Sequence, residues 1–297
     1  MAIEDGNLAA ALALVESNSD FRVLRRLPHL TEQHSNVSEN ALIGVIVDVE
    51  TTGLDFEIDE VIELGMMKFS FSRSGEIGEF FAEYKSLNAP KSKIPPSVTK
   101  LTGIGDADVS GCKIATDDVD SFIAGSALVI AHNAAFDRPF CEGLSPKFAE
   151  LSWACTATEV DWGSEGIAGS RLEYIANSFG RFYEAHRAID DCNAVANVLT
   201  FRLPISGELV LDALLRAARR TETRVFAEGA PYEVRIPLKR MGYRWNDGQN
   251  GFPRSWWKDV GSDDLDRELA ELASLDGGNI RPQLFRMTAR NRFRRHH

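Results

Sequence analysis

Long apolar runs are absent from this 297-residue sequence, so no segment offers the ~20 consecutive apolar residues that a membrane-spanning helix needs. The best N-terminal candidate, residues 8–15, is short and follows Glu4 and Asp5, which is the wrong flank for a signal peptide. Cysteine is scarce as well, and the four cysteines show neither CxxC nor zinc-site spacing. These absences disfavour a membrane or secreted protein and predict small buried thiols in the reducing cytoplasm.

The sequence also lacks a basic excess spread along the whole chain, which is typical of nucleic-acid-binding domains. The net charge is −11, and the basic excess is confined to residues 201–297, which hold 18 Lys and Arg against 13 Asp and Glu. The acidic excess of the first 200 residues fits carboxylates gathered around cations, and it equally fits an ordinary solvated surface. A hydrophobic content of 44% in a chain this long supports a globular protein with a substantial core.

Shifts in composition divide the chain into five stretches. A short apolar helix and the basic residues Arg22, Arg25 and Arg26 precede a polar segment, residues 34–40, that has the composition of a linker. The end of the chain after Asp276 carries six arginines and no acid, which predicts a mobile tail. We therefore predict an N-terminal helix and linker (1–40), an α/β domain (41–203), a connecting helix (204–221), a small C-terminal module (222–276) and an arginine-rich tail (277–297).

Residues 41–203 alternate strand-like runs with helical patterns. Residues 42–49 are almost continuously apolar and include an acid near their end, as expected of a strand buried on both faces. Residues 90–111 are rich in Pro, Gly and Ser and predict a loop with one helical turn. Three strands in succession, then strands interleaved with helices, predict an α/β fold with a mixed sheet, followed by a small α+β module. The other expected elements are strands at 61–71, 79–85 and 127–131 and helices from about 135 and at 172–179, 188–203, 209–220 and 263–275.

Two carboxylates stand at the end of the first predicted strand, within the segment Asp48-Val49-Glu50-Thr51-Thr52-Gly53-Leu54. Residues two apart on a strand point to the same face, so Asp48 and Glu50 should lie side by side. Like charges that close are costly unless cations neutralise them, and hard divalent cations prefer oxygen ligands. The alternative is a solvated strand end, which would not require an apolar run leading into both acids.

A second polar segment, Ala131-His132-Asn133-Ala134-Ala135-Phe136-Asp137, follows the strand at 127–131 directly. The carboxyl edge of a sheet is where α/β folds usually bind ligands, although Asn and Asp are also ordinary helix-start residues. A third segment, His186-Arg187-Ala188-Ile189-Asp190-Asp191, begins the helix at 188–203. Its histidine and one of its acids could reach the same pocket, but a surface histidine near helix-starting acids is equally common.

Together and in this order, the three segments make residues 41–203 similar to the DEDDh subgroup of the DnaQ-like 3′–5′ exonucleases, which includes the proofreading epsilon subunit of DNA polymerase III. The resemblance implies a ribonuclease-H-like fold and an enzyme that releases nucleoside 5′-monophosphates from nucleic acid 3′ ends. It implies that His186 is the general base and, by the family's spacing, that Asp191 rather than Asp190 is a ligand. The implied ligands of two divalent ions, Mg²⁺ or Mn²⁺, are Asp48, Glu50, Asp137 and Asp191.

Elementary chemistry agrees with that assignment. Two divalent ions about 3.5–4 Å apart can hold the attacking and the leaving oxygen of an in-line displacement, and four carboxylates balance their charge. Histidine accepts a proton near neutral pH because its ordinary pKa is ~6.5.

The resemblance also implies substrate contacts. Glu50, Thr51 and Thr52 match positions that recognise the terminal 3′-hydroxyl, and Leu54 and Phe136 match positions around the last bases. For Leu54 and Phe136 the alternative is core packing. Asn133 either orders the site or caps a helix, and His132 is interpreted as structural.

Outside the α/β domain, the C-terminal module combines basic and aromatic residues. Exposed rings and cations bind single strands by base stacking and phosphate pairing, but a small module also needs its large aromatics for a core, and we favour the core. The residues concerned are Lys239, Arg240, Tyr243, Arg244, Trp245, Arg254, Trp256, Trp257 and Lys258.

The leading hypothesis is a metal-dependent 3′–5′ exonuclease acting on DNA, in proofreading or repair. The first alternative is an exoribonuclease, which the extra domains disfavour because RNA-trimming relatives include short single-domain enzymes. The second alternative is a non-catalytic nucleic-acid-binding scaffold. It is disfavoured because such proteins usually lose metal ligands, whereas the four acids and the histidine are all present here. The expected partner is a nucleic acid 3′ end, and a polymerase or clamp partner stays open. Gln283-Leu284-Phe285 is faintly similar to clamp-binding peptides, a match we attribute to chance.

Overall fold

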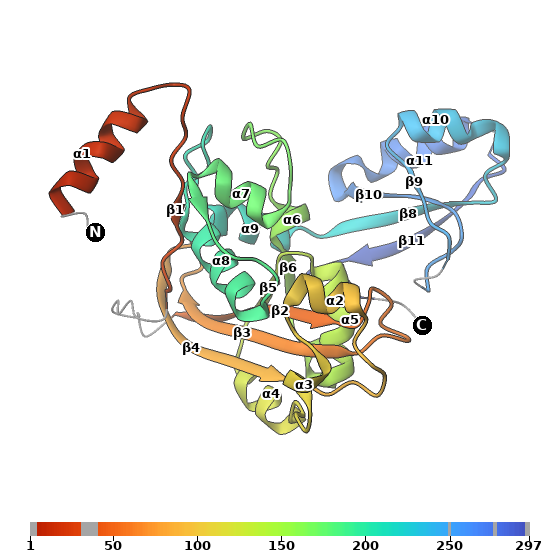
Figure 1. Cartoon of the computed structure of the whole chain (residues 1–297). Helices are drawn as coiled ribbons and strands as arrows, with labels where there is room; N and C mark the ends of the chain where they lie inside the picture. Colours follow the sequence, from red (N-terminus) through yellow and green to blue (C-terminus); the bar gives the residue numbers. More distant parts are fainter. Residues whose placement is uncertain (1–4, 31–40, 249–250, 276–277, 295–297) are drawn as a thin grey trace.

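The structure is a computed structural model that describes residues 5–30, 41–248, 251–275 and 278–294 (Figure 1). Its central sheet contains five strands, β2 (Leu42–Thr51), β3 (Val61–Phe71), β4 (Ile77–Leu87), β5 (Leu128–Ala131) and β6 (Trp153–Cys155). They are arranged in the order β4-β3-β2-β5-β6. The first three strands along the chain pair antiparallel, whereas β5 and β6 run parallel to β2. The predicted ribonuclease-H-like mixed sheet is confirmed.

Helices cover both faces of this sheet. They are α2 (Pro96–Thr102), α3 (Asp106–Val109), α4 (Thr116–Ile123), α5 (Ala134–Leu144), α6 (Thr156–Glu159), α7 (Leu172–Ser178), α8 (Ala188–Thr200) and α9 (Val210–Arg219). Alternate residues of β2 serve the two faces: Ile46 packs with α8 and α9, whereas Val45 and Val47 pack with α4 and α5. Each such burial contributes about 1.5–3 kcal/mol, which explains why β2 is apolar without alternation.

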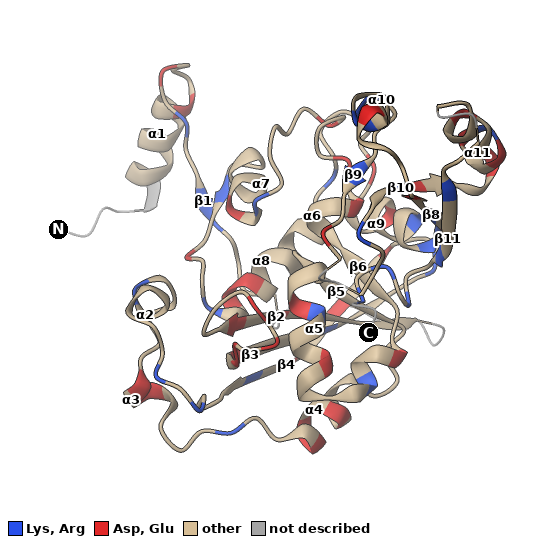
Figure 2. Ribbon diagram, turned by 90° about the vertical axis from the view of Figure 1, so that its right-hand side faces the viewer, with Lys and Arg blue, Asp and Glu red and all other residues tan. Residues whose placement is uncertain are grey.

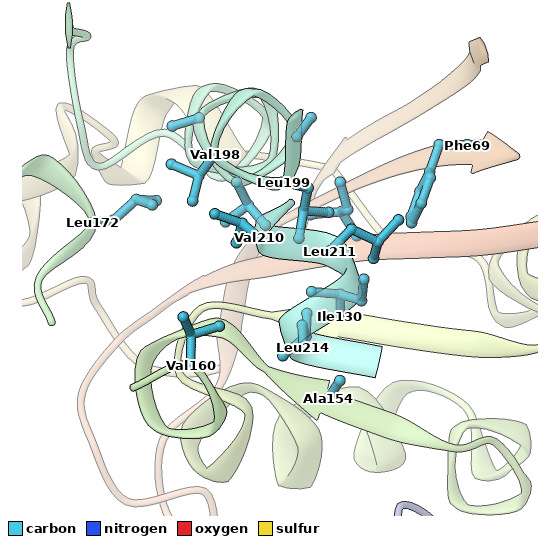
Figure 3. Packing of buried hydrophobic residues seen from close by; sticks show 14 of the residues in the cluster. Phe69, Ile130, Ala154, Val160, Leu172, Val198, Leu199, Val210, Leu211 and Leu214 are labelled. Atoms are coloured by element: carbon cyan, nitrogen blue, oxygen red, sulfur yellow. The ribbon is translucent and has the colours of Figure 1, made fainter. Parts of the chain in front are cut away.

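The layer of α8 and α9 on the sheet is shown in Figure 3. Val198 of α8 and Leu211 of α9 belong to the same buried cluster as Ile130 of β5. The predicted helices at 188–203 and 209–220 are confirmed as α8, which ends earlier than predicted, and α9, which is one residue shorter at each end. Residues 90–111, expected as a loop with one helical turn, instead form both α2 and α3, whose short apolar sides pack against the start of β3.

The N-terminal segment packs onto the α/β domain through residues 25–30, whereas its first helix is exposed and stands apart (Figure 1). It begins with α1 (Asp5–Glu16), which confirms the expected helix, and continues into β1 (Arg25–Arg26), which pairs parallel with β7 (Arg181–Phe182). Leu27 and Leu30 are buried in the same core as α8. The expected linker at residues 34–40 lies outside the described residues.

The C-terminal module is built on a second sheet. Its elements are β8 (Glu222–Glu228), the 3-10 turn η2 (Tyr232–Val234), α10 (Arg235–Arg240), β9 (Arg244–Trp245), β10 (Trp256–Gly261), the turn η3 (Ser262–Asp264), α11 (Leu265–Ser274) and β11 (Arg281–Met287). The strand order is β11-β8-β10-β9, all antiparallel. Val225 of β8, Leu238 of α10 and Leu272 of α11 share one core, so the two helices cover one face of this sheet.

The expectation of a mobile arginine-rich tail is wrong for residues 278–294, the part of it that the structure describes. β11 pairs with β8 along seven residues, and Met287 is fully buried. Beyond it, the Ala289 carbonyl accepts a hydrogen bond of 2.7 Å from the Trp153 backbone N–H and thereby satisfies the free edge of β6. Phe293 packs against the α/β core. The arginines that suggested a solvated tail alternate with apolar residues that supply this burial. The domain boundaries themselves stay predictions. Within the described part of the chain, none of the helices has the length and apolarity of a membrane span.

Candidate active site

Three carboxylates meet where β2 ends and α8 begins. Asp48 and Glu50 lie two residues apart on β2, and Asp191 lies in the first turn of α8. One oxygen of each lies within 4.8 Å of one oxygen of each of the others. Asp190, the neighbouring acid, is exposed to solvent and does not belong to this group. The geometry therefore separates the two aspartates that the helical pattern alone left equivalent.

The fourth predicted acid, Asp137, lies beside this group without meeting the same distance limit. It is in the first turn of α5 and is only 2% exposed. Loss of hydration raises the pKa of Asp137 to about 8. Backbone hydrogen bonds, the strongest of them from Val49, oppose this rise. After burial, the charge of Asp137 is the largest contribution to the raised pKa of Asp48. All four predicted acids thus act on one another.

The electrostatics of the group indicate a site for cations. Burial, followed by the charges of neighbouring acids, raises the pKa of Asp48 well above its ordinary value and that of Glu50 to about 8. Burial also raises the pKa of Asp191. So many carboxylates cannot all be ionised near neutral pH unless positive charge enters. An all-oxygen donor set is what hard divalent cations prefer, so these residues fit a divalent metal site.

Asp191 is held on both of its oxygens. The Tyr183 hydroxyl donates to Oδ1 at 2.7 Å, and the His186 backbone N–H donates to Oδ2 at 2.8 Å. These bonds, together with the charge of the His186 imidazole, oppose the effect of burial on the pKa of Asp191. Among the described non-glycine residues, His186 alone has a positive φ, 70°. Such a conformation costs about 1–3 kcal/mol, and the hydrogen bond to Asp191 helps to hold it.

Glu63 was not predicted and fixes the start of α8. It lies opposite Glu50 on β3 and is completely buried. Arg187 donates to its two oxygens at 2.8 and 3.1 Å, and the Ala188 N–H donates at 3.0 Å. These bonds outweigh burial and lower the pKa of Glu63. The signal in the sequence was an acid inside an apolar strand, which indicates a paired charge but does not name its partner.

Gly65 is a second position that the sequence analysis did not single out. It pairs with Asp48 across β2 and β3, and a Cβ built there would lie 2.5 Å from the backbone carbon of Ala188. The Gly65 carbonyl also lies 3.3 Å from the Cys192 thiol. The first turn of α8 therefore rests directly on β3, and this close approach brings Asp191 to Asp48.

The turn after β2 presents the predicted substrate residues. The Thr51 hydroxyl donates to the Gly53 carbonyl at 2.5 Å, and the Thr52 hydroxyl donates to Asp59 at 2.9 Å. These bonds shape a turn that leaves Leu54 84% exposed. Core packing, the alternative considered for Leu54, is therefore wrong.

The residues after β5 divide into exposed and buried positions. Phe136 is half-buried against Phe140, with ring centroids 5.1 Å apart, so core packing does apply to it in part. Asn133 is exposed and its side chain makes no capping hydrogen bond. The two ring nitrogens of His132 lie 2.8 Å from the Thr156 hydroxyl and 2.7 Å from the Ser170 carbonyl, and burial lowers its pKa to about 4. His132 is thus a neutral structural residue.

A model of the RNase_T exonuclease family matches residues 45–199, which span the sheet and every acid of the site. The chain belongs to this exonuclease family. It is 34% identical over 167 residues to the DNA polymerase III subunit epsilon of Treponema pallidum, covering 52% of this chain and 73% of that one. It is 31% identical over 166 residues to the PolC-type DNA polymerase III of Clostridium perfringens, covering 53% of this chain but only 11% of the relative's length.

Two solved structures are also similar. Exonuclease X in complex with 5′ overhanging duplex DNA has 22% identity and a TM-score of 0.39, covering 58% of this chain and 99% of that one. The nuclease domain of 3′hExo, a DEDDh family member bound to rAMP, has 16% identity and a TM-score of 0.45, covering 58% of this chain and 97% of that one.

Proposed function

We propose that this RNase_T-family exonuclease is a metal-dependent 3′–5′ exonuclease that acts on DNA and releases nucleoside 5′-monophosphates. The single observation that carries the proposal is the convergence of Asp48, Glu50 and Asp191 from two distant segments, with Asp137 beside them. The name of the Treponema pallidum relative, a DNA polymerase III subunit, favours DNA over RNA.

The four acids would hold two divalent ions, Mg²⁺ or Mn²⁺. When bound, such ions make a coordinated water more acidic and neutralise the charge that develops on the phosphodiester. The protein's own part is positional: Tyr183 and the His186 N–H fix both oxygens of Asp191, and Glu63 fixes the helix that carries it. In this proposal a ring nitrogen of His186 takes the proton of the water that attacks phosphorus, and the histidine later returns it to solvent. The bond from phosphorus to the 3′ oxygen of the preceding nucleotide breaks, and that oxygen takes up a proton from solvent.

The turn after β2 would select the chain end. Glu50 and the backbone of Thr51 and Thr52 lie next to the acids and are proposed to contact the terminal 3′-hydroxyl, which would make the cleavage exonucleolytic. Leu54 is proposed to pack on the last base because its side chain is apolar and open to solvent. Phe136, in the first turn of α5, and Asn133, the residue before that helix, are proposed to line the same end.

The test compares initial rates on matched single-stranded DNA and RNA, with a mismatched primer–template alongside. We expect DNA to be hydrolysed faster, with 5′-mononucleotides as products, and Asp48→Asn to remove the activity. Faster hydrolysis of RNA would replace this proposal by the exoribonuclease alternative. Equal activity in preparations of wild type and Asp48→Asn would mean that the activity does not come from this site, and would favour the non-catalytic scaffold.

A polymerase partner in the cytoplasm is a second proposal, supported by the same name of a subunit. It is tested by co-elution of the full chain with a replicative DNA polymerase catalytic subunit on gel filtration. The segment Gln283-Leu284-Phe285 does not support a clamp partner, because it lies within β11 and is paired with β8.

A further inference from the structure

The C-terminal module carries exposed aromatic and apolar side chains that its core does not use. Tyr232 is 72% exposed, Trp245 52% and Ile236 50%. Tyr243, by contrast, is buried among Val225 and Leu238 beneath the module's helices. The core interpretation of the module's aromatics therefore holds for Tyr243, and in part for Trp256 and Trp257, which pack half-buried against the module's clusters. It does not account for the exposed Trp245, or for the exposed Tyr232.

The exposed rings and neighbouring basic side chains form a continuous series of contacts. Arg235 stacks on Tyr232, with 3.6 Å from its guanidinium carbon to the ring centroid, and Lys239 lies 5.7 Å from the centroid of Trp256. Arg235 and Lys239 are four residues apart on α10, and residues at that spacing are neighbours on a helix surface. Trp256 in turn meets Trp245 edge-on, with centroids 5.6 Å apart. We call the line Tyr232, Arg235, Lys239, Trp256 and Trp245 the α10 track.

The cations of the α10 track are not neutralised by acids. Within the described residues, Arg235 and Lys239 form no ion pair, and neither does the adjacent Arg240. Some of the module's other cations are neutralised instead: Arg224 pairs with Asp259, and Lys258 pairs with Glu268. Segment 232–240 contains three basic residues and a single acid, Glu233. Figures 1 and 2 place α10 at the outer side of the module, away from the central sheet.

Neighbouring rings and unpaired cations have the chemistry that single-stranded nucleic acid requires. Bases stack on exposed aromatic rings, while phosphates pair with Lys and Arg, and neither contact depends on sequence. A purely acidic peptide would use the cations but not the exposed faces of Tyr232 and Trp245. We propose that the α10 track is a second contact site for the single-stranded nucleic acid whose 3′ end enters the acidic site. This proposal rests on the proposed function for the identity of the strand.

The experiment measures binding of the full chain to fluorescent dT oligonucleotides by anisotropy, in an Asp48→Asn background that prevents hydrolysis. Trp245→Ala and Lys239→Glu should each weaken binding of a ~20-nucleotide strand by about tenfold, and the loss should fade as the strand shortens. Lys239→Glu should also flatten the salt dependence of binding. The matched control is Arg267→Glu, an equal charge change at an exposed position of α11 that lies outside the track.

Unchanged affinity in both track variants, or an equal loss in Arg267→Glu, would overturn the proposal. So would absence of dT binding by the parent protein. Melting temperatures within a few degrees of the parent exclude unfolding as the cause. Hydrolysis by the wild-type chain is measured separately: loss of binding in the track variants with no wild-type hydrolysis would contradict the proposed function and leave the track standing.

Discussion

The α/β domain gathers acids in a buried cluster, whereas the C-terminal module exposes cations and rings on its surface. In the acidic site, the charge of each carboxylate destabilises the ionised form of its neighbours, and the repulsion is relieved by protonation or by an added cation. On the α10 track, cations and rings stabilise one another without any ligand. Hydrolysis at the acidic site should therefore be highly sensitive to the loss of any one acid, because the acids act as one group. Binding at the α10 track should weaken only gradually with each substitution.

The largest effect that distinguishes the two regions is expected from Asp48→Asn. Removing one of the converging carboxylates should lower kcat by about a thousandfold or more, since charge stabilisation in such sites is among the largest catalytic contributions. Asp190→Asn, a matched change one residue from Asp191 but exposed, should change kcat less than about threefold. Steady-state hydrolysis of a single-stranded oligonucleotide measures both. Similar losses in the two variants would contradict the placement of the site.

Within the acidic site, His186→Ala distinguishes the proposed general base from the proposed metal ligands. General-base catalysis contributes about 10²- to 10⁴-fold, so kcat should fall by that factor while divalent metals still raise the melting temperature as in wild type. The paired measurement is hydrolysis rate and thermal shift with Mn²⁺. If the thermal shift vanishes and the rate falls only slightly, His186 is a ligand or a structural support and not the base.

Tyr183→Phe should have an intermediate effect. It deletes one charge-assisted hydrogen bond to Asp191 without changing the ring, and a loss of about tenfold in kcat is expected from a bond of that kind. A positioning role predicts that the loss shrinks when Mn²⁺ is raised to saturation, because metal binding can then orient Asp191. An unchanged rate at low Mn²⁺ would show that the His186 N–H alone positions this acid.

The smallest effect is a pH dependence of stability without metal. The pKa of Asp137 is raised to about 8 in the fold, against ~3.9 in an unfolded chain, so the folded state retains a proton that the unfolded state has released. Stability should therefore fall as pH rises from about 4 to about 8, by several degrees in melting temperature. Asp137→Asn should lack this component. Identical pH profiles of wild type and Asp137→Asn, recorded with a chelator present, would contradict it.

The sequence predicted most of the acidic site because its motifs are local. Two acids at alternate strand positions necessarily share a face, so Asp48 and Glu50 followed from strand geometry alone. The choice of Asp191 over Asp190 came from the family resemblance, and the structure shows its physical basis in the bonds from Tyr183 and His186.

Features that depend on contacts between distant segments were not predictable in the same way. The role of Glu63 requires Arg187, 124 residues later, and that of Gly65 requires the close approach of α8. The arginine-rich tail was wrongly predicted to be mobile because charge count was weighed above the alternating apolar residues Phe285 and Met287. Likewise, the module's aromatics could not be divided into core and surface before their burial was known.

The most direct test of the account is calorimetric titration of Mn²⁺ into the full chain and into three single variants, Asp48→Asn, Asp191→Asn and Asp190→Asn. Convergence of Asp48, Glu50, Asp137 and Asp191 predicts saturable binding by wild type and by Asp190→Asn, with binding strongly reduced in the other two. Equal binding by all four proteins would contradict a shared metal site.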